Sequence, residues 1–485
     1  MIAVIVFGGG AIGMSIELVA SRLLAPYFGN SLFVWTSIIG VMLGFMSLGY
    51  FLGGRFADRH LDEGNLFWIL IGAAISVALI AFSEAAVLPS LAKGESLRLF
   101  AVLSMVLLFA VPSTLLGMVS PYCIRLRMHA VEDSGATVGS LYALSTLGSI
   151  VGTFATGFWL ISLFGTHDLI TLLAAGLAAL SLLAVGKGFE WRRAAALGVV
   201  VLLVGLALAG VAQGAETIDT PYDRYMLREG ADPATGEALI GLSRDQISAE
   251  SAAYKVSGKP YRFEYYRFYD LAGVLEGDVE RALVIGGGTF SYPRLFITEN
   301  PYATMDVVEI DPKLYDIAKS DFGYADDERI NLFFEDGRTF LNRAEGPYDA
   351  VFMDAFKSQE TVPYQLTTRE TWQRCFDLLD EDGVLVMNVI ASPRDDRSTF
   401  FASLYATIAS VFPQVHAFRV QIEAGPGLQN TSIIALKNPT TDALSLLREK
   451  APEFADRAIG NYAPPAGTRL LTDDFAPVDQ YLLGF

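Results

Sequence analysis

Long apolar runs dominate the first half of the chain, and short apolar runs separated by polar turns dominate the second half. A helix needs about 20 apolar residues to cross the ~30 Å hydrocarbon core of a membrane. The first run carries Glu17 and lacks a basic leader, which argues against a cleaved signal peptide. The pattern predicts seven transmembrane helices near residues 2–24, 33–56, 66–89, 97–119, 138–164, 168–186 and 194–212.

Small residues four positions apart recur in these runs, at Gly40/Gly44, Gly49/Gly53 and Gly148/Gly152. Such spacing lets two helices approach closely, so we expect these glycines at helix–helix contacts. Glu17 is an ionisable residue inside a run, where a charge is costly. It is either a polar tie between helices or part of a functional site.

After residue 280 the pattern changes to strands that alternate with helices. Helices are expected over 291–300, 312–322 and 369–383, the last closed by Gly383. Short apolar runs predict five strands at 281–288, 305–311, 330–337, 348–356 and 384–390. This alternation predicts an α/β doubly wound, Rossmann-like sheet.

Composition divides the chain near residue 213. Hydrophobic residues make up 52% and charged residues 18%, which excludes a disordered chain and fits a membrane protein. Residues 1–212 hold ten basic and ten acidic residues, so the whole net charge of −18 lies in the second half. We expect a transmembrane region at 1–212, a small N-terminal β subdomain at 213–275 and a Rossmann-like domain at 276–485.

The charge and the cysteines exclude several classes of function. A nucleic-acid-binding protein needs a basic surface, which a strongly acidic second half does not offer. Cys123 and Cys375 lie far apart without a CxxC spacing, so they predict neither a disulfide framework nor a cysteine zinc site.

Glycines and acids end successive predicted strands. Gly286, Gly287 and Gly288 end the first, Glu309 the second, Asp336 the third and Asp354 the fourth. Ligands of doubly wound sheets bind at these carboxyl ends, where an acid after the second strand accepts hydrogen bonds from ribose hydroxyls. The glycine loop lacks the G-x-G-x-x-G spacing of dinucleotide sites and the GK[ST] of phosphate loops. A nucleoside sulfonium, with ribose and adenine but no phosphate, fits better.

The second half resembles the spermidine synthase family, here fused to a multi-pass membrane region. Single pieces are not specific, but their order along residues 216–485 is. The matching pieces are "TPYDRYMLRE" (220–229), "LVIGGG" (283–288), "VVEIDP" (307–312), "EDGRTFL" (335–341), "YDAVFMDAF" (348–356), "LTTRETWQRCFDLLDEDGVLVMNVI" (366–390) and "LLTDDFAPVDQY" (470–481).

The resemblance implies a class I S-adenosylmethionine-dependent methyltransferase-like fold and an aminopropyl transfer without a metal. The donor would be decarboxylated S-adenosylmethionine, the acceptor a diamine such as putrescine, and the by-product methylthioadenosine. Asp354 matches the family's catalytic aspartate, Glu309 its ribose acid and Asp336 its adenine-side acid. Gln246 matches a cofactor-side glutamine. Members of the family commonly pair, so a homodimer is also implied.

The family's substrate-binding pattern is only partly present. Tyr222 and Asp223 stand where the family has Tyr-Gln. Thr289 replaces the acid after the three glycines, and Lys357 replaces the second aspartate, which helps to bind the diamine. Candidate substitutes and pocket aromatics are Glu264, Asp270, Glu360, Tyr265, Tyr266, Tyr269 and Tyr364, although aromatic stripes also form cores.

These departures leave two alternatives open: a methyltransferase that uses intact S-adenosylmethionine, and a polyamine-binding or transport protein without catalysis. Orientation is also open. Basic residues are more frequent in the loops after even-numbered runs, which places those loops in the cytoplasm and residues 213–485 outside. The sulfonium donor is made inside cells, which favours a cytoplasmic location for residues 213–485. An eighth or re-entrant segment would reconcile this location with the distribution of basic residues. We expect a multi-pass protein of the inner cell membrane with a cytoplasmic soluble domain.

Overall fold

The fold is described from a computed structural model of the 485-residue chain. The described residues are 1–29, 31–91, 97–128, 134–185, 190–210, 217–244, 251–356, 362–391, 399–421, 429–460 and 462–482.

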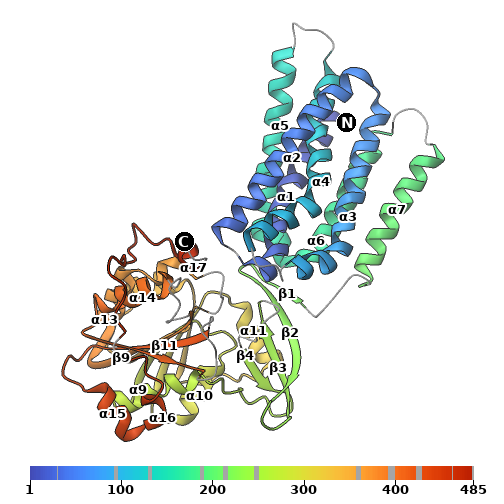
Figure 1. The fold of residues 1–485 in the computed structure, drawn as a ribbon. Coiled ribbons are helices and arrows are strands. Elements are labelled where there is room, and N and C mark those ends of the chain that lie inside the picture. Colours follow the sequence, from blue (N-terminus) through green and yellow to red (C-terminus); the bar gives the residue numbers. More distant parts are fainter. Residues whose placement is uncertain are drawn as a thin grey trace. The chain divides into compact units, whose positions relative to one another are not determined.

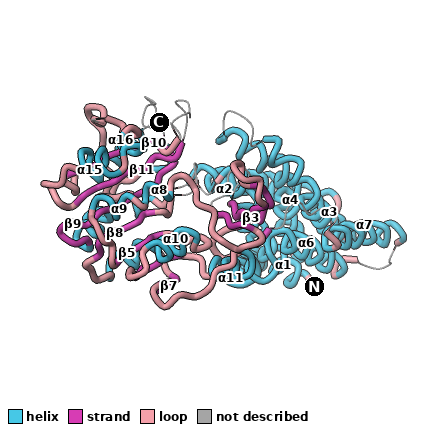
Figure 2. The backbone as a smooth tube through the Cα atoms, turned by 90° about the horizontal axis from the view of Figure 1, so that it is seen from below, coloured by secondary structure: helices cyan, strands magenta, loops and turns pink. Residues whose placement is uncertain are grey.

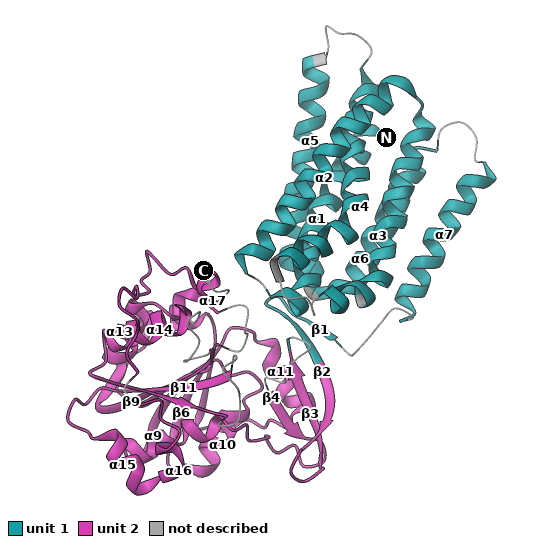
Figure 3. Ribbon diagram, in the orientation of Figure 1, with its two compact units in different colours: residues 1–226, 244–246 teal, residues 227–243, 247–485 magenta. Residues whose placement is uncertain are grey.

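The chain forms two compact units, coloured separately in Figure 3. The helical unit comprises residues 1–226 with 244–246, and the α/β unit comprises residues 227–243 with 247–485. This division falls inside a strand rather than at residue 212. The three domain boundaries expected from the sequence therefore stay a prediction.

Within the described residues, the helical unit contains seven helices that are long and apolar enough to cross a membrane. Their arrangement is drawn in Figure 1. The break expected after residue 164 is present, since Gly165 has non-helical angles (φ 72°, ψ 170°) and divides one continuous helical run. The elements are α1 (Ile2–Phe28), α2 (Leu32–Arg59), α3 (Glu63–Leu91), α4 (Leu97–Arg127), α5 (Ser134–Ala155), the π-helical turn η1 (Thr156–Leu160), α6 (Ile161–Leu182) and α7 (Trp191–Leu208).

Two of the three glycine pairs lie at close helix contacts. A Cβ on Gly49 or Gly53 would come closer than 3.0 Å to the α4 backbone, and one on Gly148 or Gly152 would do the same to α1. The expectation is wrong for Gly40/Gly44, where a Cβ would meet nothing within 4 Å among the described residues. Spacing alone does not say which face of a helix meets a neighbour.

The end of the helical unit is fixed by polar contacts. The Thr166 N–H donates to Asp219 Oδ2 at 3.0 Å, and the Thr166 hydroxyl bonds the other oxygen of the same carboxylate. Asp219 ends strand β1 (Thr217–Asp219). Because Gly165 breaks the helix, the Thr166 N–H has no intrahelical partner, and Asp219 caps the new helix start. Arg22 of α1 bonds the Pro221 carbonyl.

A small four-stranded sheet, in the order β1-β2-β3-β4, precedes the large one. Strand β3 pairs antiparallel with β4, and Leu239 faces Tyr254 in the register. Its other strands are β2 (Arg224–Ala231), β3 (Ala238–Ser243) and β4 (Ser251–Tyr254).

The large sheet has seven strands in the order β10-β11-β9-β8-β5-β6-β7. Strands β5 to β9 run parallel, whereas β11 is antiparallel to β9 and to β10. This is the doubly wound, Rossmann-like arrangement that the sequence predicted. The strands are β5 (Arg281–Ile285), β6 (Thr304–Glu309), β7 (Ile330–Phe334), β8 (Tyr348–Met353), β9 (Leu379–Ala391), β10 (Gln414–Arg419) and β11 (Gln429–Leu436).

Helices cover both faces of this sheet (Figures 1 and 2). Alternate strand residues point to opposite faces. Val284 packs into the hydrophobic core on one face of the sheet, and Leu283 and Ile285 pack into the core on the opposite face. One layer contains α8 (Tyr266–Tyr269), α9 (Leu271–Leu275), α10 (Ser291–Glu299), α11 (Lys313–Asp321), α15 (Ala443–Lys450) and α16 (Pro452–Ala455). The other contains α12 (Gly337–Arg343), η2 (Tyr364–Leu366), α13 (Arg369–Leu378), α14 (Thr399–Ala409) and α17 (Val478–Leu482).

One predicted helix end is wrong. Helix α13 ends at Leu378, and the residues up to Gly383 already belong to β9. The pairing with β8 jumps from Tyr348↔Leu379 to Ala350↔Val384, so the polar residues between form a bulge. Both cysteines, Cys123 and Cys375, are fully buried.

Candidate active site

The register of the parallel strands aligns their carboxyl ends. Ile285 of β5 pairs with Val308 of β6 on one side and with Met353 of β8 on the other. Glu309 in turn pairs with Phe334 of β7. The glycine loop, Glu309, Asp336 and Asp354 therefore follow four neighbouring strands at one edge of the sheet, as the sequence predicted. This edge includes the switch point at β5, where doubly wound folds bind ligands.

Gly286 brings the glycine loop against the residue after β8. Its φ is 99°, a conformation that side chains rarely adopt. A Cβ at this position would lie 2.7 Å from the backbone oxygen of Asp354. The Gly286 N–H donates to the Val308 oxygen and the Asp354 N–H to the Ile285 oxygen. Glycine is thus required here for two independent reasons.

Glu309 joins the glycine loop to the turn after β6. Its Oε2 accepts from the Gly288 N–H at 2.8 Å, and its Oε1 accepts from the Asp311 N–H at 3.0 Å. The side chain is 7% exposed. Each carboxylate oxygen has two acceptor positions, and among the described residues each oxygen accepts one of these two backbone bonds. Backbone bonds fix the orientation of the predicted ribose acid.

Asp336 caps helix α12. Its Oδ1 accepts from the Thr339 N–H at 3.0 Å, and its Oδ2 is 3.5 Å from the Gln365 amide nitrogen. Acids are favoured at this position because they satisfy the first free N–H groups of a helix. The predicted adenine-side acid therefore also has a structural role.

Asp354 lies among tyrosines of the segment "FEYYRFYD". Asp354 is 3% exposed to solvent. Burial raises the pKa of Tyr265, Tyr266 and Tyr269, and the nearby Asp354 carboxylate raises each of them further. All three phenols stay protonated and can act as hydrogen-bond donors. The sequence left open whether these tyrosines line a pocket or form core; they are buried, and they adjoin the predicted catalytic carboxylate.

Thr289, which replaces the family's acid after the three glycines, and the next residue, Phe290, are both buried. Phe290 has a left-handed backbone (φ 56°), and its buried ring packs against Tyr324. Thr289 is fully buried, with its hydroxyl 3.1 Å from that of Ser291. A buried hydroxyl pair thus stands where the family pattern has an acid.

The two candidate substrate acids of the "FEYYRFYD" segment are paired with arginines. Glu264 accepts from Arg457 at 2.7 Å and from Arg267 at 3.2 Å. Asp270 forms an ion pair with Arg262. Burial raises the pKa of Asp270 to about 6, with Arg262 acting in the opposite direction. Paired carboxylates of this kind are less available to a cationic amine.

The remaining predicted residues are not brought into this site by a described contact. Tyr222 and Asp223 belong to the helical unit, where Asp223 accepts from Arg244 at 3.2 Å. Tyr364 is 56% exposed at the start of η2. Gln246, Glu360 and Lys357 lie outside the described residues.

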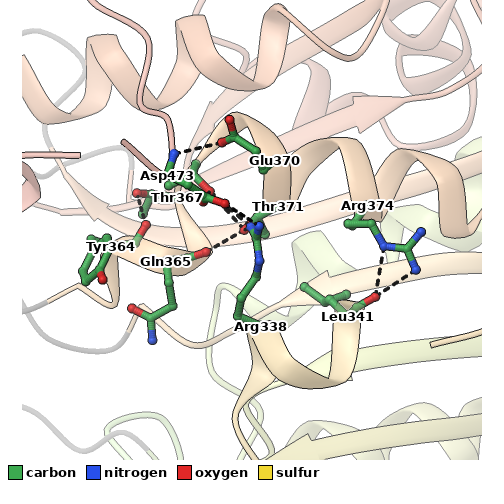
Figure 4. A network of polar contacts seen from close by, with 10 residues as sticks. Arg338, Leu341, Tyr364, Gln365, Thr367, Glu370, Thr371, Arg374 and Asp473 are labelled. Atoms are coloured by element: carbon green, nitrogen blue, oxygen red, sulfur yellow. Dashed lines mark hydrogen bonds and ion pairs between the residues drawn. The ribbon is translucent and has the colours of Figure 1, made fainter. Parts of the chain in front are cut away.

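Sequence reasoning missed Gln365. Its amide nitrogen lies 3.5 Å from Asp336 Oδ2. The residue stands on the turn that precedes α13 (Figure 4). An uncharged side chain in a short turn has no periodicity to mark it. Its position after the loop of the fourth strand was the one available signal.

Comparison with known proteins extends this geometry. The spermine/spermidine synthase domain matches residues 268–445. The chain is 32% identical over 236 residues to the polyamine aminopropyltransferase of Vibrio vulnificus (strain CMCP6), covering 45% of this chain and 75% of that protein. The chain belongs to the spermine/spermidine synthase family. It is also 27% identical over 207 residues to the polyamine aminopropyltransferase of Clostridium beijerinckii, covering 40% of this chain and 71% of that protein.

Solved structures of the family were found as well. A "probable spermidine synthase" from Corynebacterium glutamicum is 19% identical with a TM-score of 0.43, covering 55% of this chain and 98% of that one. A spermidine synthase in complex with the transition-state analogue AdoDATO is 17% identical with a TM-score of 0.34, covering 54% and 85%. As a member of this family, the chain is a transferase.

Proposed function

We propose that the chain is a membrane-anchored aminopropyltransferase. It transfers the aminopropyl group of decarboxylated S-adenosylmethionine to a diamine such as putrescine and releases methylthioadenosine. The observation that carries the proposal is the position of Asp354: a buried carboxylate next to the glycine loop, among protonated tyrosines. It occurs in a chain that is similar to the polyamine aminopropyltransferases of Vibrio vulnificus and Clostridium beijerinckii.

The residues of the site divide the chemistry between them. Asp354 accepts a proton from the ammonium of the diamine, which frees the nitrogen lone pair. The nitrogen attacks the carbon next to the sulfonium. A C–N bond forms as the C–S bond breaks, and the electron pair of the C–S bond stays on the sulfur of the departing methylthioadenosine. Glu309 and Asp336 orient the nucleoside so that this carbon and the amine are in line. The tyrosine hydroxyls stabilise the negative charge of Asp354 before proton transfer.

The helical unit supports a multi-pass location in the cell membrane, because its seven helices are long and apolar enough to cross one. We place the α/β unit in the cytoplasm, where its sulfonium substrate is made. We also keep the homodimer as part of the proposal, since the family resemblance implies it.

The deciding experiment identifies the by-product. Detergent-solubilised full-length protein is incubated with putrescine or another amine and with either decarboxylated or intact S-adenosylmethionine. The nucleoside product is then identified by mass spectrometry. Methylthioadenosine together with an aminopropylated amine supports the proposal. S-adenosylhomocysteine would show a methyltransferase instead, and binding of amines without either product would show a non-catalytic protein.

A further inference from the structure

The motif "LLTDDFAPVDQY" near the C-terminus has no role in the site described so far. Its first part is anchored by backbone contacts. Leu471 is fully buried; its oxygen accepts from the Arg369 N–H at 2.8 Å, and its N–H donates to the Thr407 hydroxyl at 2.9 Å. Thr472 and Phe475 then close a tight turn by two backbone bonds of 2.9 Å. This turn presents Asp473 to the start of α13.

Asp473 contacts Arg338 (Figure 4), which lies in the first turn of α12, the helix capped by Asp336. Its Oδ2 accepts from Arg338 at 2.7 Å and its Oδ1 from the Thr368 hydroxyl at 2.7 Å. Arg338 also donates to Thr368 at 3.2 Å and to the Thr371 hydroxyl. The Arg338 side chain is 17% exposed and that of Asp473 is 48% exposed, so the arginine is largely buried while its carboxylate partner is half open to water.

The network continues to the turn that carries Gln365. The Thr371 hydroxyl donates to the Gln365 backbone oxygen at 2.6 Å. The Thr367 hydroxyl donates to the Tyr364 oxygen at 2.7 Å, and the indole of Trp372 donates to the Thr367 oxygen at 3.0 Å. The backbone of the turn is therefore fixed from the side of α13.

The same turn lies against the start of α12. A Cβ on Gly337 would lie 2.6 Å from Ile285, the last residue of β5, and 3.6 Å from Leu366. Arg338 follows Gly337 directly. The Asp473 contact thus fixes the turn to the helix start that carries Asp336.

We propose that Gln365 is a further nucleoside-binding residue, and that Arg338 and Asp473 are positioning residues that hold it beside Asp336. The inference rests on the proposed function. The edge of adenine presents an amino donor beside a ring-nitrogen acceptor. A carboxylate can only accept, whereas an amide group can also donate. Asp336 and Gln365 together therefore match both groups of adenine, and a 6-oxo base such as hypoxanthine would mismatch Asp336.

The chain offers a matched control in Arg374. This arginine also ties α13 to α12, by bonds of 3.2 and 3.0 Å to the Leu341 oxygen, at the opposite end of α12 (Figure 4). No described bond joins it to Asp473 or to the turn at 364–368. Arg374→Ala therefore removes a comparable tie between the two helices and leaves the proposed arrangement intact.

The experiment measures three quantities on the full-length protein: the Kd for methylthioadenosine by calorimetry, the KM and kcat with decarboxylated S-adenosylmethionine, and the thermal unfolding midpoint. Arg338→Ala, Asp473→Ala and Gln365→Ala should each raise Kd and KM roughly tenfold, the effect of one lost charge-assisted or buried hydrogen bond. The value of kcat should stay within about twofold, because Asp354 is untouched. Arg338→Lys should restore part of the affinity.

Arg374→Ala should lower the unfolding midpoint while Kd and KM change less than about twofold. If Arg374→Ala raises Kd as much as Arg338→Ala does, the network is only structural and the inference fails. Unchanged affinity in Gln365→Ala removes Gln365 from the site. A wild-type protein that binds no nucleoside overturns the proposed function as well; normal wild-type binding with unaffected variants overturns the inference alone.

Discussion

Glycine serves different purposes in the helical unit and in the α/β unit. In the helical unit, Gly148 and Gly152 have helical conformations, and they are needed because another helix backbone occupies the space of a Cβ. In the α/β unit, Gly286 is needed both for its positive φ and for the neighbouring Asp354 backbone. The first use sets the distance between helices, and the second shapes a site.

The two halves of the chain also differ in net charge and in the surroundings of their acidic side chains. Residues 1–212 have no net charge, whereas the second half carries the whole −18. In the α/β unit, buried acids such as Glu309 are oriented by backbone N–H groups rather than left to solvent. Glu309 is the acid that we propose to bind the ribose, so its fixed orientation supports the proposal that the α/β unit performs the chemistry.

The largest expected effect comes from Asp354→Asn. The amide cannot accept the proton of the attacking amine, so turnover should fall by roughly 10²- to 10⁴-fold. Affinity for methylthioadenosine, measured by calorimetry, should be nearly unchanged. Turnover equal to that of the parent would show that Asp354 is not the base.

Gly286→Ala should destabilise the α/β unit by roughly 3 kcal/mol or more, since it combines left-handed strain with a backbone clash. Chemical denaturation followed by tyrosine and tryptophan fluorescence measures this. Gly273→Ala is the control, because a Cβ there meets nothing within 4 Å among the described residues. The control should be neutral or slightly stabilising; equal effects in both variants would contradict the argument.

Gly148→Ala should destabilise the helical unit by about 1–3 kcal/mol, because α1 and α5 must separate to admit the methyl group. Gly44→Ala, on a face where a Cβ meets nothing within 4 Å among the described residues, should have no measurable effect. The unfolding midpoint in detergent tests the pair. Neither variant should change the KM for the sulfonium donor, whereas Gly286→Ala should.

Glu309→Gln should weaken nucleoside binding roughly tenfold. A glutamine has one acceptor oxygen, so the N–H of either Gly288 or Asp311 loses its partner and the ribose loses a carboxylate. Calorimetry with methylthioadenosine gives the affinity. An unchanged Kd would exclude Glu309 from the site.

A further effect, on the pH dependence of stability, concerns Asp270. Its pKa rises from an ordinary 3.8 to about 6 in the folded protein, chiefly because of burial. The folded state then binds the proton more tightly than the unfolded chain does. This stabilisation is present below about pH 4 and is lost as the pH rises towards 6. The unfolding midpoint is measured against pH for the wild type and for Asp270→Asn. Between pH 4 and 6 the midpoint should fall less in the variant than in the wild type. If the two curves run parallel, the raised pKa does not belong to Asp270.

The sequence predicted most of the fold because periodicity reports burial. In the part of the chain that the structure describes, seven helices correspond to the seven apolar runs, and all five predicted parallel strands are present. The end of α13 could not be predicted in this way. The residues from Leu379 to Gly383 have a helix-like polar pattern, and only pairing with β8 identifies them as a bulged strand.

The strand-end acids were predictable because chain order alone places them at one edge of a parallel sheet. The partners of other acids were not. Glu264 meets Arg457, which lies 193 residues away in the chain, and Asp473 meets Arg338 across 135 residues. No local pattern encodes such pairs, so only the folded structure separates a paired acid from an available one.

The burial of both native thiols has a practical consequence. Burial raises the pKa of Cys375 to about 12, and Cys123 is equally inaccessible to solvent. Buried thiols are inert towards polar reagents. If a single cysteine is engineered into an exposed turn of the otherwise wild-type protein, it will therefore be the one that reacts, because Cys123 and Cys375 will not be labelled. Impermeant maleimides applied to intact cells could then establish which side of the membrane each loop faces.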